Sequence, residues 1–573
     1  MAQIKDSSLK KNDQVIGLVI LIFSLILYFI FKLPFNFSVL CASGNEGFYF
    51  IYSQYLLTEN ILRTFGGPLN VLLYATILKL FSFGTWSIIA VHFIQTFVVM
   101  LIGIVMYLVL KKIISSNIYS GLAVLFWILI QMTPIGGWGT KLELESAMAL
   151  EAENLCVLFS LCSIYFLLIS LEKEKPFSLS LLAGVLASCS MISKLSGSVL
   201  IIAVFCWAIY LLIVSRNSFN KIKDRFLIFF LGFILSFLFF NVIIFYFMNP
   251  VTFWEKSAWV GSYSKDFLKS PQSFLILLAT FMFGRGNSNS ILYAVYILFL
   301  LCGLVRNILM KKDNLELSFI PLLSIWGIGN ICAVIAPGAY GCYYFILVLP
   351  SIAIFIALGL NDLFSFRKII NHHYLKVFIF VLISLFFLHR IWIVFPIYFN
   401  YAKRIIKTSV FFQPQSLNDP VLPNGNNGYY RSNILLFADI LSSLLPDYKD
   451  RLYIFYFSKY RNIEPSIYLY IKRMPASTVV PDFFHYKRYF APYTKMLIED
   501  LTKNVPRLFV INREVFLRNN EEITKEDLMP LINWFAIFLK ENYHFKNSIE
   551  VPCEDFNEKE IYQIYERNKA PSL

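Results

Sequence analysis

Charged side chains are scarce in the first 400 residues of this chain, and several stand at the ends of long apolar runs. Glu46 follows the first run and Glu153 opens a later one, while Lys194 separates two runs and Arg390 interrupts the last. A carboxylate at a membrane surface can take the proton of a hydroxyl group, and a cation can offset charge that develops on a phosphate. An unpaired acid at the mouth of a membrane span is costly, so these residues need either a partner or a function.

The composition indicates where such chemistry takes place. Of the 573 residues, 58% are hydrophobic and only 15% are charged, whereas an ordinary soluble chain has about 45–50% and about 25%. This excess of apolar residues rules out a soluble enzyme, a disordered chain and a disulfide scaffold. The formal net charge is +14, but the basic residues are scattered in short loops between apolar runs. Membrane topology therefore explains them better than nucleic-acid binding does.

Eleven apolar runs are long enough, or nearly so, to cross about 30 Å of hydrocarbon. They lie near residues 15–31, 84–110, 114–134, 154–171, 177–193, 195–215, 226–248, 288–305, 317–336, 343–360 and 374–399. Basic residues collect in alternate loops, starting with the N-terminus, which by the positive-inside rule is then cytoplasmic. An odd number of spans places the residues after 400 outside. We therefore expect a multi-pass protein of the plasma (inner) membrane.

The last part of the chain follows a different pattern. RLYIFYF and RLFVIN are typical of strands, and APYTKMLIEDLTKN has the apolar spacing of a helix. Alternating strand and helix predict a small α/β domain. No GxGxxG or Walker motif marks a nucleotide site. We predict an α-helical polytopic membrane body over residues 1–400 and an extracytoplasmic α/β domain over residues 401–573.

Acidic residues of the membrane body gather on its predicted outer face, which suggests an acid-lined outer cavity. These acids are Glu46, Glu59, Glu143, Glu145, Glu151, Glu153, Glu255 and Asp266.

Several short segments resemble the GT-C superfamily of membrane glycosyltransferases, especially the bacterial protein O-mannosyltransferases and the aminoarabinose transferases of lipid A. Those families have an Asp-Glu motif and then an interfacial helix that opens with Gly-Pro-Leu. The similar segments here are GNEGFYFIYSQYLLTENI and GGPLNVLLYATILKLFSFG in the first outer loop, EAENLCVLFSLCSIYFLL for an acid-led fourth span, LLAGVLASCSMISKLSG for a hairpin with a lysine, YYFILVLPSIAIFIALGL for an Arg-Tyr span, and EPSIYLYIKRMPAS for a segment of the outer domain.

The resemblance covers most of the chain and implies a transfer reaction. The donor would be a sugar on a polyprenyl phosphate, and the acceptor a hydroxyl of an envelope lipid, a glycan or a protein. The acceptor would attack the anomeric carbon from the face opposite the lipid phosphate, so that the configuration inverts. The lipid carries the activated sugar across the membrane, which explains an enzyme without a phosphate-binding loop.

The resemblance also implies roles for single residues. Glu46 is the expected base and Glu153 a second catalytic carboxylate, and Lys194 is a candidate ligand of the donor phosphate. The full set of expected substrate-binding residues is Asn45, Glu145, Lys194, Arg285, Tyr343, Tyr344 and Arg390.

Two positions depart from the family pattern, and each candidate has an ordinary alternative. Asn45 stands where the relatives have Asp, so either Glu46 takes the role of the base or the activity is altered, and Tyr343 stands where they have Arg. Glu46 can instead be a solvated loop carboxylate, Glu153 can pair with a lysine, and Lys194 can snorkel to the membrane interface.

Cofactors and function class remain open at this level. The six His residues show no metal-ligand spacing, although clustered acids can hold Mg²⁺ or Mn²⁺, so a divalent metal stays an option. The first alternative to a transferase is a transporter or flippase of a lipid-linked glycan, which usually shows internal repeats, and the second half of this chain shows no repeat of the first. The other alternative is a non-catalytic envelope assembly protein, which Asn45 keeps open.

Overall fold

The computed structural model divides into two compact units. The helical unit comprises Met1–Asn36, Leu62–Leu73 and His92–Tyr401, and the sheet unit comprises Phe37–Ile61, Tyr74–Val91 and Ala402–Leu573. The structure describes residues 2–37, 44–60, 62, 67–114, 116–131, 150–172, 176–214, 216–247, 319–335, 346–365, 388, 399, 402–403, 406, 431–445, 447, 449–455, 467–477, 487–512, 525–552 and 559–568. Two segments before residue 92 thus group with the C-terminal part of the chain, and the division at residue 400 stays a prediction.

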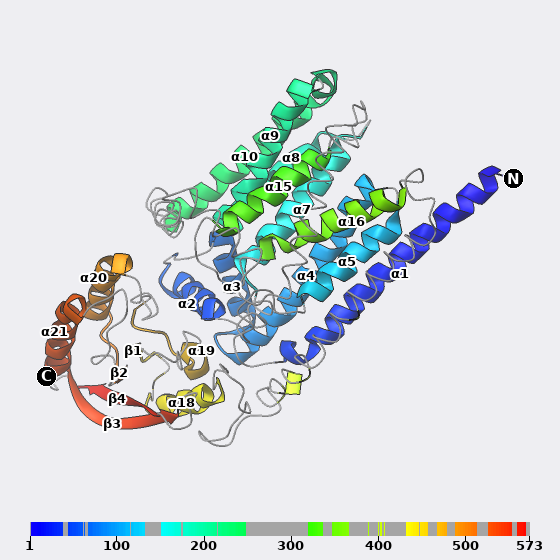
Figure 1. Ribbon diagram of the computed structural model, residues 1–573. Coiled ribbons are helices and arrows are strands. Elements are labelled where there is room, and N and C mark those ends of the chain that lie inside the picture. The colour runs from blue at the N-terminus through cyan, green and yellow to red at the C-terminus, as the bar shows by residue number, and fades with distance from the viewer. Residues whose placement is uncertain are drawn as a thin grey trace. The chain divides into compact units, whose positions relative to one another are not determined.

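Helices make up the described part of the helical unit (Figure 1), and two of them, α3 and α4, continue into the sheet unit. The elements are α1 (Ala2–Asn36), α3 (Pro68–Phe81), α4 (Thr85–Ile113), α5 (Asn117–Gln131), α7 (Ala152–Ser170), α8 (Ser178–Ser193), the 3₁₀ turn η1 (Leu195–Gly197), α9 (Ser198–Val214), α10 (Arg216–Phe247), α15 (Phe319–Ile335) and α16 (Leu349–Ser365).

Five of the described segments are long and apolar enough to cross a membrane, and they support a multi-pass membrane protein. They are Asn12–Asn36, Trp86–Ile113, Ala152–Ser170, Leu195–Val214 and Ile222–Phe247. Shorter apolar helices cover Pro68–Phe81, Asn117–Leu129, Ser178–Ser193, Phe319–Ala333 and Leu349–Asn361. Helices therefore occupy nine of the eleven predicted runs. The runs near 288–305 and, except for Leu388 and Phe399, 374–399 lie outside the described residues, so the count of eleven spans stays a prediction.

Small and polar residues let these helices pack closely, as is usual between membrane helices. A Cβ added to Gly184 of α8 would lie 2.0 Å from the carbonyl oxygen of Phe229 in α10, so the two backbones touch. Asp13 of α1 accepts a hydrogen bond from the backbone N–H of Asn117, 2.7 Å away, and thereby caps the start of α5.

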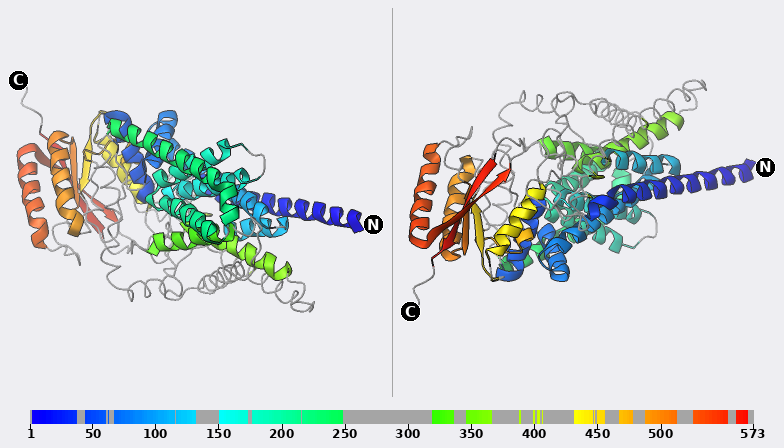
Figure 2. Two further views of the ribbon diagram at one scale, coloured as in Figure 1. Left: turned by 90° about the horizontal axis from the view of Figure 1, so that it is seen from above. Right: turned by 90° about the horizontal axis from the view of Figure 1, so that it is seen from below.

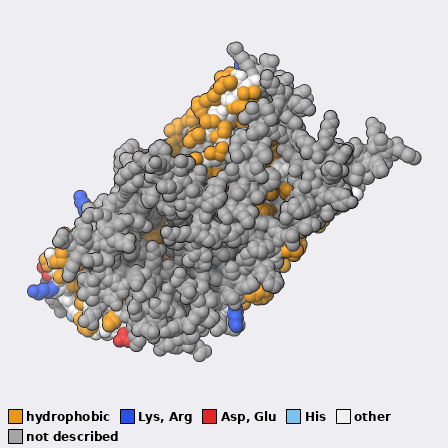
Figure 3. Space-filling view, viewed as in Figure 1, with side chains coloured by type: hydrophobic (Ala, Val, Ile, Leu, Met, Phe, Trp, Pro, Cys, Tyr) orange, Lys and Arg blue, Asp and Glu red, His pale blue; other side chains and the backbone are white. Residues whose placement is uncertain are grey.

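The outward faces of α9 and α10 are apolar. Leu227, Phe239 and Val242 on α10 and Ile213 on α9 are each more than half exposed. In Figure 3, hydrophobic side chains gather where α9 and α10 lie in Figure 1. Such a face suits contact with lipid.

The sheet unit contains a four-stranded sheet whose strand order is β1-β2-β4-β3. β1 pairs with β2 in parallel, and β4 pairs antiparallel with both β2 and β3. The sheet is therefore mixed, with parallel and antiparallel pairs, and the predicted alternation of strands and helices is found in this unit. The elements are α2 (Gly44–Glu59), α18 (Arg431–Ser443), β1 (Leu452–Phe455), α19 (Ile467–Ile471), α20 (Lys487–Lys503), β2 (Leu508–Asn512), α21 (Lys525–Asn542), β3 (Tyr543–Pro552) and β4 (Lys559–Arg567).

Helices cover both faces of this sheet, so every residue of β1 and β2 is buried. Tyr453, Phe455 and Phe509 face a core formed with α20 and α21. Residues of the opposite alternation face α18, where the rings of Phe437 and Tyr562 lie 5.1 Å apart. The two views of Figure 2 show α20 and α21 together on one face of the sheet.

Candidate active site

Glu153 and Lys194 form an ion pair between the start of α7 and the end of α8. Glu153 lies in the first turn of α7, where the helix dipole favours a negative charge. Lys194 follows the last residue of α8 in an extended conformation, before η1 begins. Its Nζ atom contacts Oε1 of Glu153, whose side chain is 1% exposed, against 18% for Lys194. The ordinary alternative for Glu153, a lysine partner, is therefore present, and the lysine is itself a predicted site residue.

Hydroxyl groups fix α7 against α8 and so hold this pair in place. Ser160 Oγ and Ser190 Oγ are 2.8 Å apart, and Ser190 Oγ also donates to the carbonyl of Cys156 over 2.9 Å. Further along, Ser163 Oγ donates to the carbonyl of Ala183 over 2.7 Å. Small polar side chains commonly join membrane helices in this way. The contacts lie within the two helices whose ends carry the ion pair.

The Gly-Pro-Leu-Asn segment at the start of α3 packs on the end of α8. A Cβ added to Gly67 would lie 1.8 Å from the carbonyl oxygen of Ile192 and 2.3 Å from that of Ser193. Only a residue without a side chain allows this approach. The first turn of α3 is therefore held beside the residue that precedes Lys194.

Asn70, in that first turn, is a polar residue that the sequence analysis missed. Its side chain is completely buried, and within the described structure neither Oδ1 nor Nδ2 has a hydrogen-bond partner. Leaving a buried amide unpartnered costs about 1–3 kcal/mol, so such a group usually serves a ligand or a structural purpose. The available signal was the polar Asn that directly follows Gly-Pro-Leu at the start of an otherwise apolar helix.

The charges around Lys194 are mostly negative. Glu151, the residue before α7, is 1% exposed, and Oε2 of Glu153 is buried with no hydrogen-bond partner in the described residues. Burial lowers the pKa of the Lys194 ammonium, and the Glu151 carboxylate opposes that shift. Two buried carboxylates thus share the surroundings of one lysine, and Oε2 of Glu153 can still accept a hydrogen bond.

Glu46 lies in the first turn of α2, in the sheet unit, and is 0% exposed. Its alternative role as a solvated loop carboxylate is therefore wrong. The rings of Phe48 and Tyr52 stack nearby on α2, 6.1 Å apart. The other end of α2 is anchored because Tyr55 donates a 2.6 Å hydrogen bond to the carbonyl of Pro475.

The side chains of six predicted site residues lie outside the described part of the structure. The side chain of Asn45, the neighbour of Glu46 in α2, lies outside the described residues. The same holds for all atoms of Glu145, Arg285, Tyr343, Tyr344 and Arg390.

Within the described ranges, no three His, Cys, Asp or Glu side chains lie close enough to hold a metal ion. The carboxylates near Lys194 thus do not form a metal-binding set among these residues.

Solved structures share the architecture of this chain. ArnT from Cupriavidus metallidurans bound to undecaprenyl phosphate superposes with a TM-score of 0.52 at 11% identity, over 96% of this chain and 97% of that one. The chain has the GT-C fold. The oligosaccharyltransferase of Archaeoglobus fulgidus in complex with Zn and sulfate also shares it, with a TM-score of 0.52 at 14% identity over 87% of this chain and 68% of that one. No family model matches the sequence, and no curated protein matches it.

Proposed function

We propose that this chain is a membrane glycosyltransferase that moves a sugar from a polyprenyl-phosphate donor to a hydroxyl of an envelope lipid, glycan or protein. The observation that carries the proposal is the pair of buried Glu153 and partly buried Lys194 beside α3, in a GT-C fold that in ArnT was solved with undecaprenyl phosphate. The pair combines a cation that could bind a phosphate with a carboxylate at the end of a candidate membrane span. Such a transfer requires a cation to offset charge that develops on the leaving phosphate, and the carboxylate of Glu153 can hold that cation in place.

The donor phosphate is proposed to bind Lys194. An ammonium that is partly buried interacts more strongly with a phosphate than an exposed one does, because less water competes. The Nδ2 group of Asn70 is a second proposed donor to the phosphate, since its hydrogen bonds are otherwise unmade. Glu153 then keeps Lys194 oriented before the donor arrives, and afterwards shares it with the phosphate.

Glu46 is proposed to act as the base. The acceptor oxygen forms a bond to the anomeric carbon while the bond from that carbon to the phosphate oxygen breaks. The hydroxyl proton passes to the Glu46 carboxylate, and the lipid phosphate leaves with the electron pair. Arg285, Arg390, Tyr343 and Tyr344 are proposed to contact the donor, and Asn45 and Glu145 the acceptor or the sugar.

The orientation in the membrane is part of the same proposal. The N-terminus is proposed to be cytoplasmic and residues 401–573 extracytoplasmic, so that transfer takes place on the outer face. Reporter fusions after residue 573 that are active only outside the cytoplasm test this directly. Activity of a cytoplasm-specific reporter at that position would contradict it.

Sugar transfer in nanodiscs is the decisive experiment. The protein is supplied with a panel of polyprenyl-phosphate sugars and extracted envelope lipids, and the wild type is compared with Glu46→Gln. We expect transfer by the wild type and a loss of about 10²–10⁴-fold in kcat for Glu46→Gln. Glu499→Gln is the matched control, because Glu499 is an exposed acid on α20. Partial recovery in the double variant Asn45→Asp, Glu46→Gln would support proton transfer at the start of α2.

Other outcomes select the competing functions. Movement of the lipid-linked sugar across the membrane without transfer would identify a transporter. Absence of both transfer and transport by a properly folded wild type would overturn the proposal and favour a non-catalytic assembly protein.

A further inference from the structure

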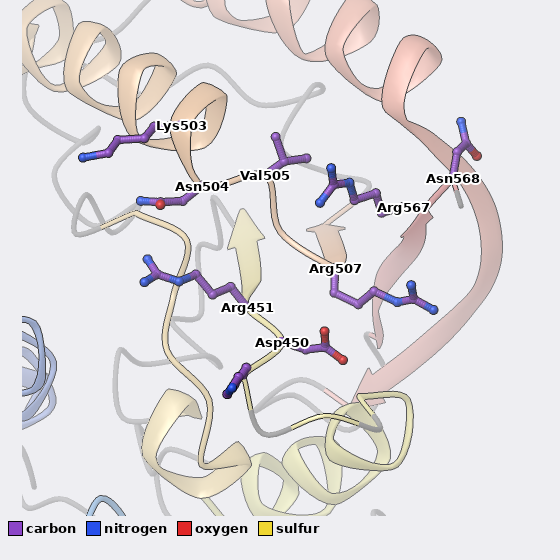
Figure 4. A pocket seen from close by; sticks show the side chains of 9 residues that line it. Asp450, Arg451, Lys503, Asn504, Val505, Arg507, Arg567 and Asn568 are labelled. Atoms are coloured by element: carbon purple, nitrogen blue, oxygen red, sulfur yellow. The ribbon is translucent and has the colours of Figure 1, made fainter. Parts of the chain in front are cut away.

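The sheet unit contains a cavity of about 540 Å³ whose lining is strongly basic. It lies where α20 ends and where β1 and β2 begin (Figure 4). Five of its residues carry positive charge and one carries negative charge. The lining consists of Lys449, Asp450, Arg451, Lys503, Asn504, Val505, Arg507, Arg567 and Asn568.

The three arginines lie side by side at the adjacent ends of β1, β2 and β4. The backbone N–H of Arg507 donates to the carbonyl of Arg451 over 2.7 Å, and that of Arg567 donates to the carbonyl of Arg507 over 3.0 Å. Arg451 and Arg507 each precede a strand, while Arg567 ends β4. By the alternation of residues along a strand, all three lie on the same face of the sheet as Tyr453 and Phe509, which face α20 and α21. Like charges opposite one another destabilise a sheet, so this row requires compensation by negative charge.

Acidic partners compensate only part of the row. Arg451 pairs with Glu59, the last residue of α2, and Arg507 pairs with Glu566 over 2.6 Å. Arg567 and Lys503 are both exposed, and within the described structure no acid pairs with either of them. Arg567 and Lys503 are therefore two cations at the cavity without an ion-pair partner among the described residues.

We propose that this cavity is a binding site for a phosphate group. Arg567 and Lys503 together match the two negative charges of a phosphate monoester or a diphosphate, whereas a single carboxylate would neutralise only one of them. Guanidinium groups bind phosphate oxygens through paired hydrogen bonds. The Nδ2 groups of Asn504 and Asn568 can add donors, since the Oδ1 atom of Asn568 already lies 3.0 Å from Nδ1 of His544. The phosphate can be a free anion or the headgroup of a phosphorylated lipid.

Binding measurements on the full-length protein in neutral detergent test the site. Inorganic pyrophosphate probes the free anion, and dihexanoyl phosphatidic acid probes a lipid phosphate, with dihexanoyl phosphatidylcholine as its comparison. The pocket variant is Lys503→Gln, Arg567→Gln. The matched control is Lys495→Gln, Lys540→Gln, which removes the same charge from exposed residues of α20 and α21 outside the cavity.

We expect the wild type and the control to bind at least one of the two phosphate probes, pyrophosphate or phosphatidic acid, with equal affinity. The pocket variant should bind that probe at least about tenfold more weakly. Tighter binding of phosphatidic acid than of pyrophosphate would identify a lipid headgroup as the source, and the reverse a free phosphate. Equal affinity of pocket variant and control would overturn the proposal. So would equal binding of phosphatidylcholine and phosphatidic acid, or no binding of either phosphate probe by the wild type. The result does not depend on sugar transfer, so it stands or falls separately from the proposed function.

Discussion

Lys194 Nζ contacts Glu153 Oε1 although the two residues are 41 positions apart in the chain. The contact joins the first turn of one apolar helix to the residue that follows another. A nearly buried carboxylate beside a partly buried ammonium is a sensitive arrangement, because loss of either partner leaves the other charge uncompensated.

Lys194→Met is expected to destabilise the protein by about 3 kcal/mol, because it removes the ion-pair partner of the buried Glu153 carboxylate. The double variant Glu153→Gln, Lys194→Met should recover most of that stability but not donor binding. Thermal unfolding in detergent and donor affinity separate the two effects. Lys112→Met is the control, because the Lys112–Glu172 pair is about 40% exposed and its loss should cost about 1 kcal/mol or less. Full transfer by the double variant would remove Lys194 from the site.

Asn70→Leu should leave the stability unchanged or increase it, because it replaces a buried amide whose hydrogen bonds are unmade with an apolar side chain of similar size. If Asn70 binds the donor phosphate, the same change should raise KM for the donor about tenfold. Steady-state kinetics and thermal unfolding check both expectations. A large drop in stability with unchanged KM would show a structural role instead.

Gly67→Ala should disrupt the contact between α3 and α8, because the new Cβ would overlap the carbonyl oxygen of Ile192 at 1.8 Å. Overpacking against a backbone costs about 1–3 kcal/mol or more. Gly84→Ala is a matched control, since the nearest atom to its Cβ would be Cε of Lys472 at 3.6 Å. Equal unfolding temperatures of the two variants would contradict the close packing.

Glu566 should make the stability of the protein dependent on pH in the acid range. The hydrogen bond from Lys546 lowers the pKa of Glu566 below its ordinary value of 4.5, and the charges of Lys546 and Arg507 act in the same direction. A lowered pKa in the folded state adds stability above the ordinary pKa, and that stability is lost as the pH falls through the folded value. The free energy of unfolding, measured from pH 6 to pH 3, should therefore fall less steeply for Glu566→Gln than for the wild type. Parallel curves for the two proteins would rule out this contribution.

The helices and strands could largely be predicted from local patterns, but their ends could not. The apolar run near 226–248 predicted a span, whereas α10 already begins at Arg216. Hydrophobicity indicates which residues lie in the hydrocarbon core of the membrane. A helix, in contrast, continues as long as its backbone N–H and C=O groups hydrogen-bond to each other. For the same reason α1 extends to Ala2, well before the apolar run that begins at Val15.

The sequence could indicate single charged residues as candidates for the site, but it could not indicate which of them contact one another. Glu153 and Lys194 stood out because charges are rare among apolar runs, but nothing local indicates which lysine meets which acid. Asn70 was missed because an Asn at the start of a helix is ordinary in sequence, and only its complete burial makes it unusual. Arg451 and Arg507 each directly precede a strand that begins with Leu and an aromatic residue, and this repeated Arg-Leu-aromatic pattern is visible in the sequence.

The sequence by itself indicates whether each segment favours water or the membrane interior, because the free energies of transferring side chains from water to lipid add up along the chain. It thereby predicted a membrane body, an α/β region after it and a short set of charged residues among apolar runs. Only the tertiary structure decided which charges meet. The pairing of Glu153 with Lys194 depends on the faces through which α7 and α8 pack, and the row of Arg451, Arg507 and Arg567 depends on strand register. Both are set by contacts between residues far apart in sequence, which no local pattern contains.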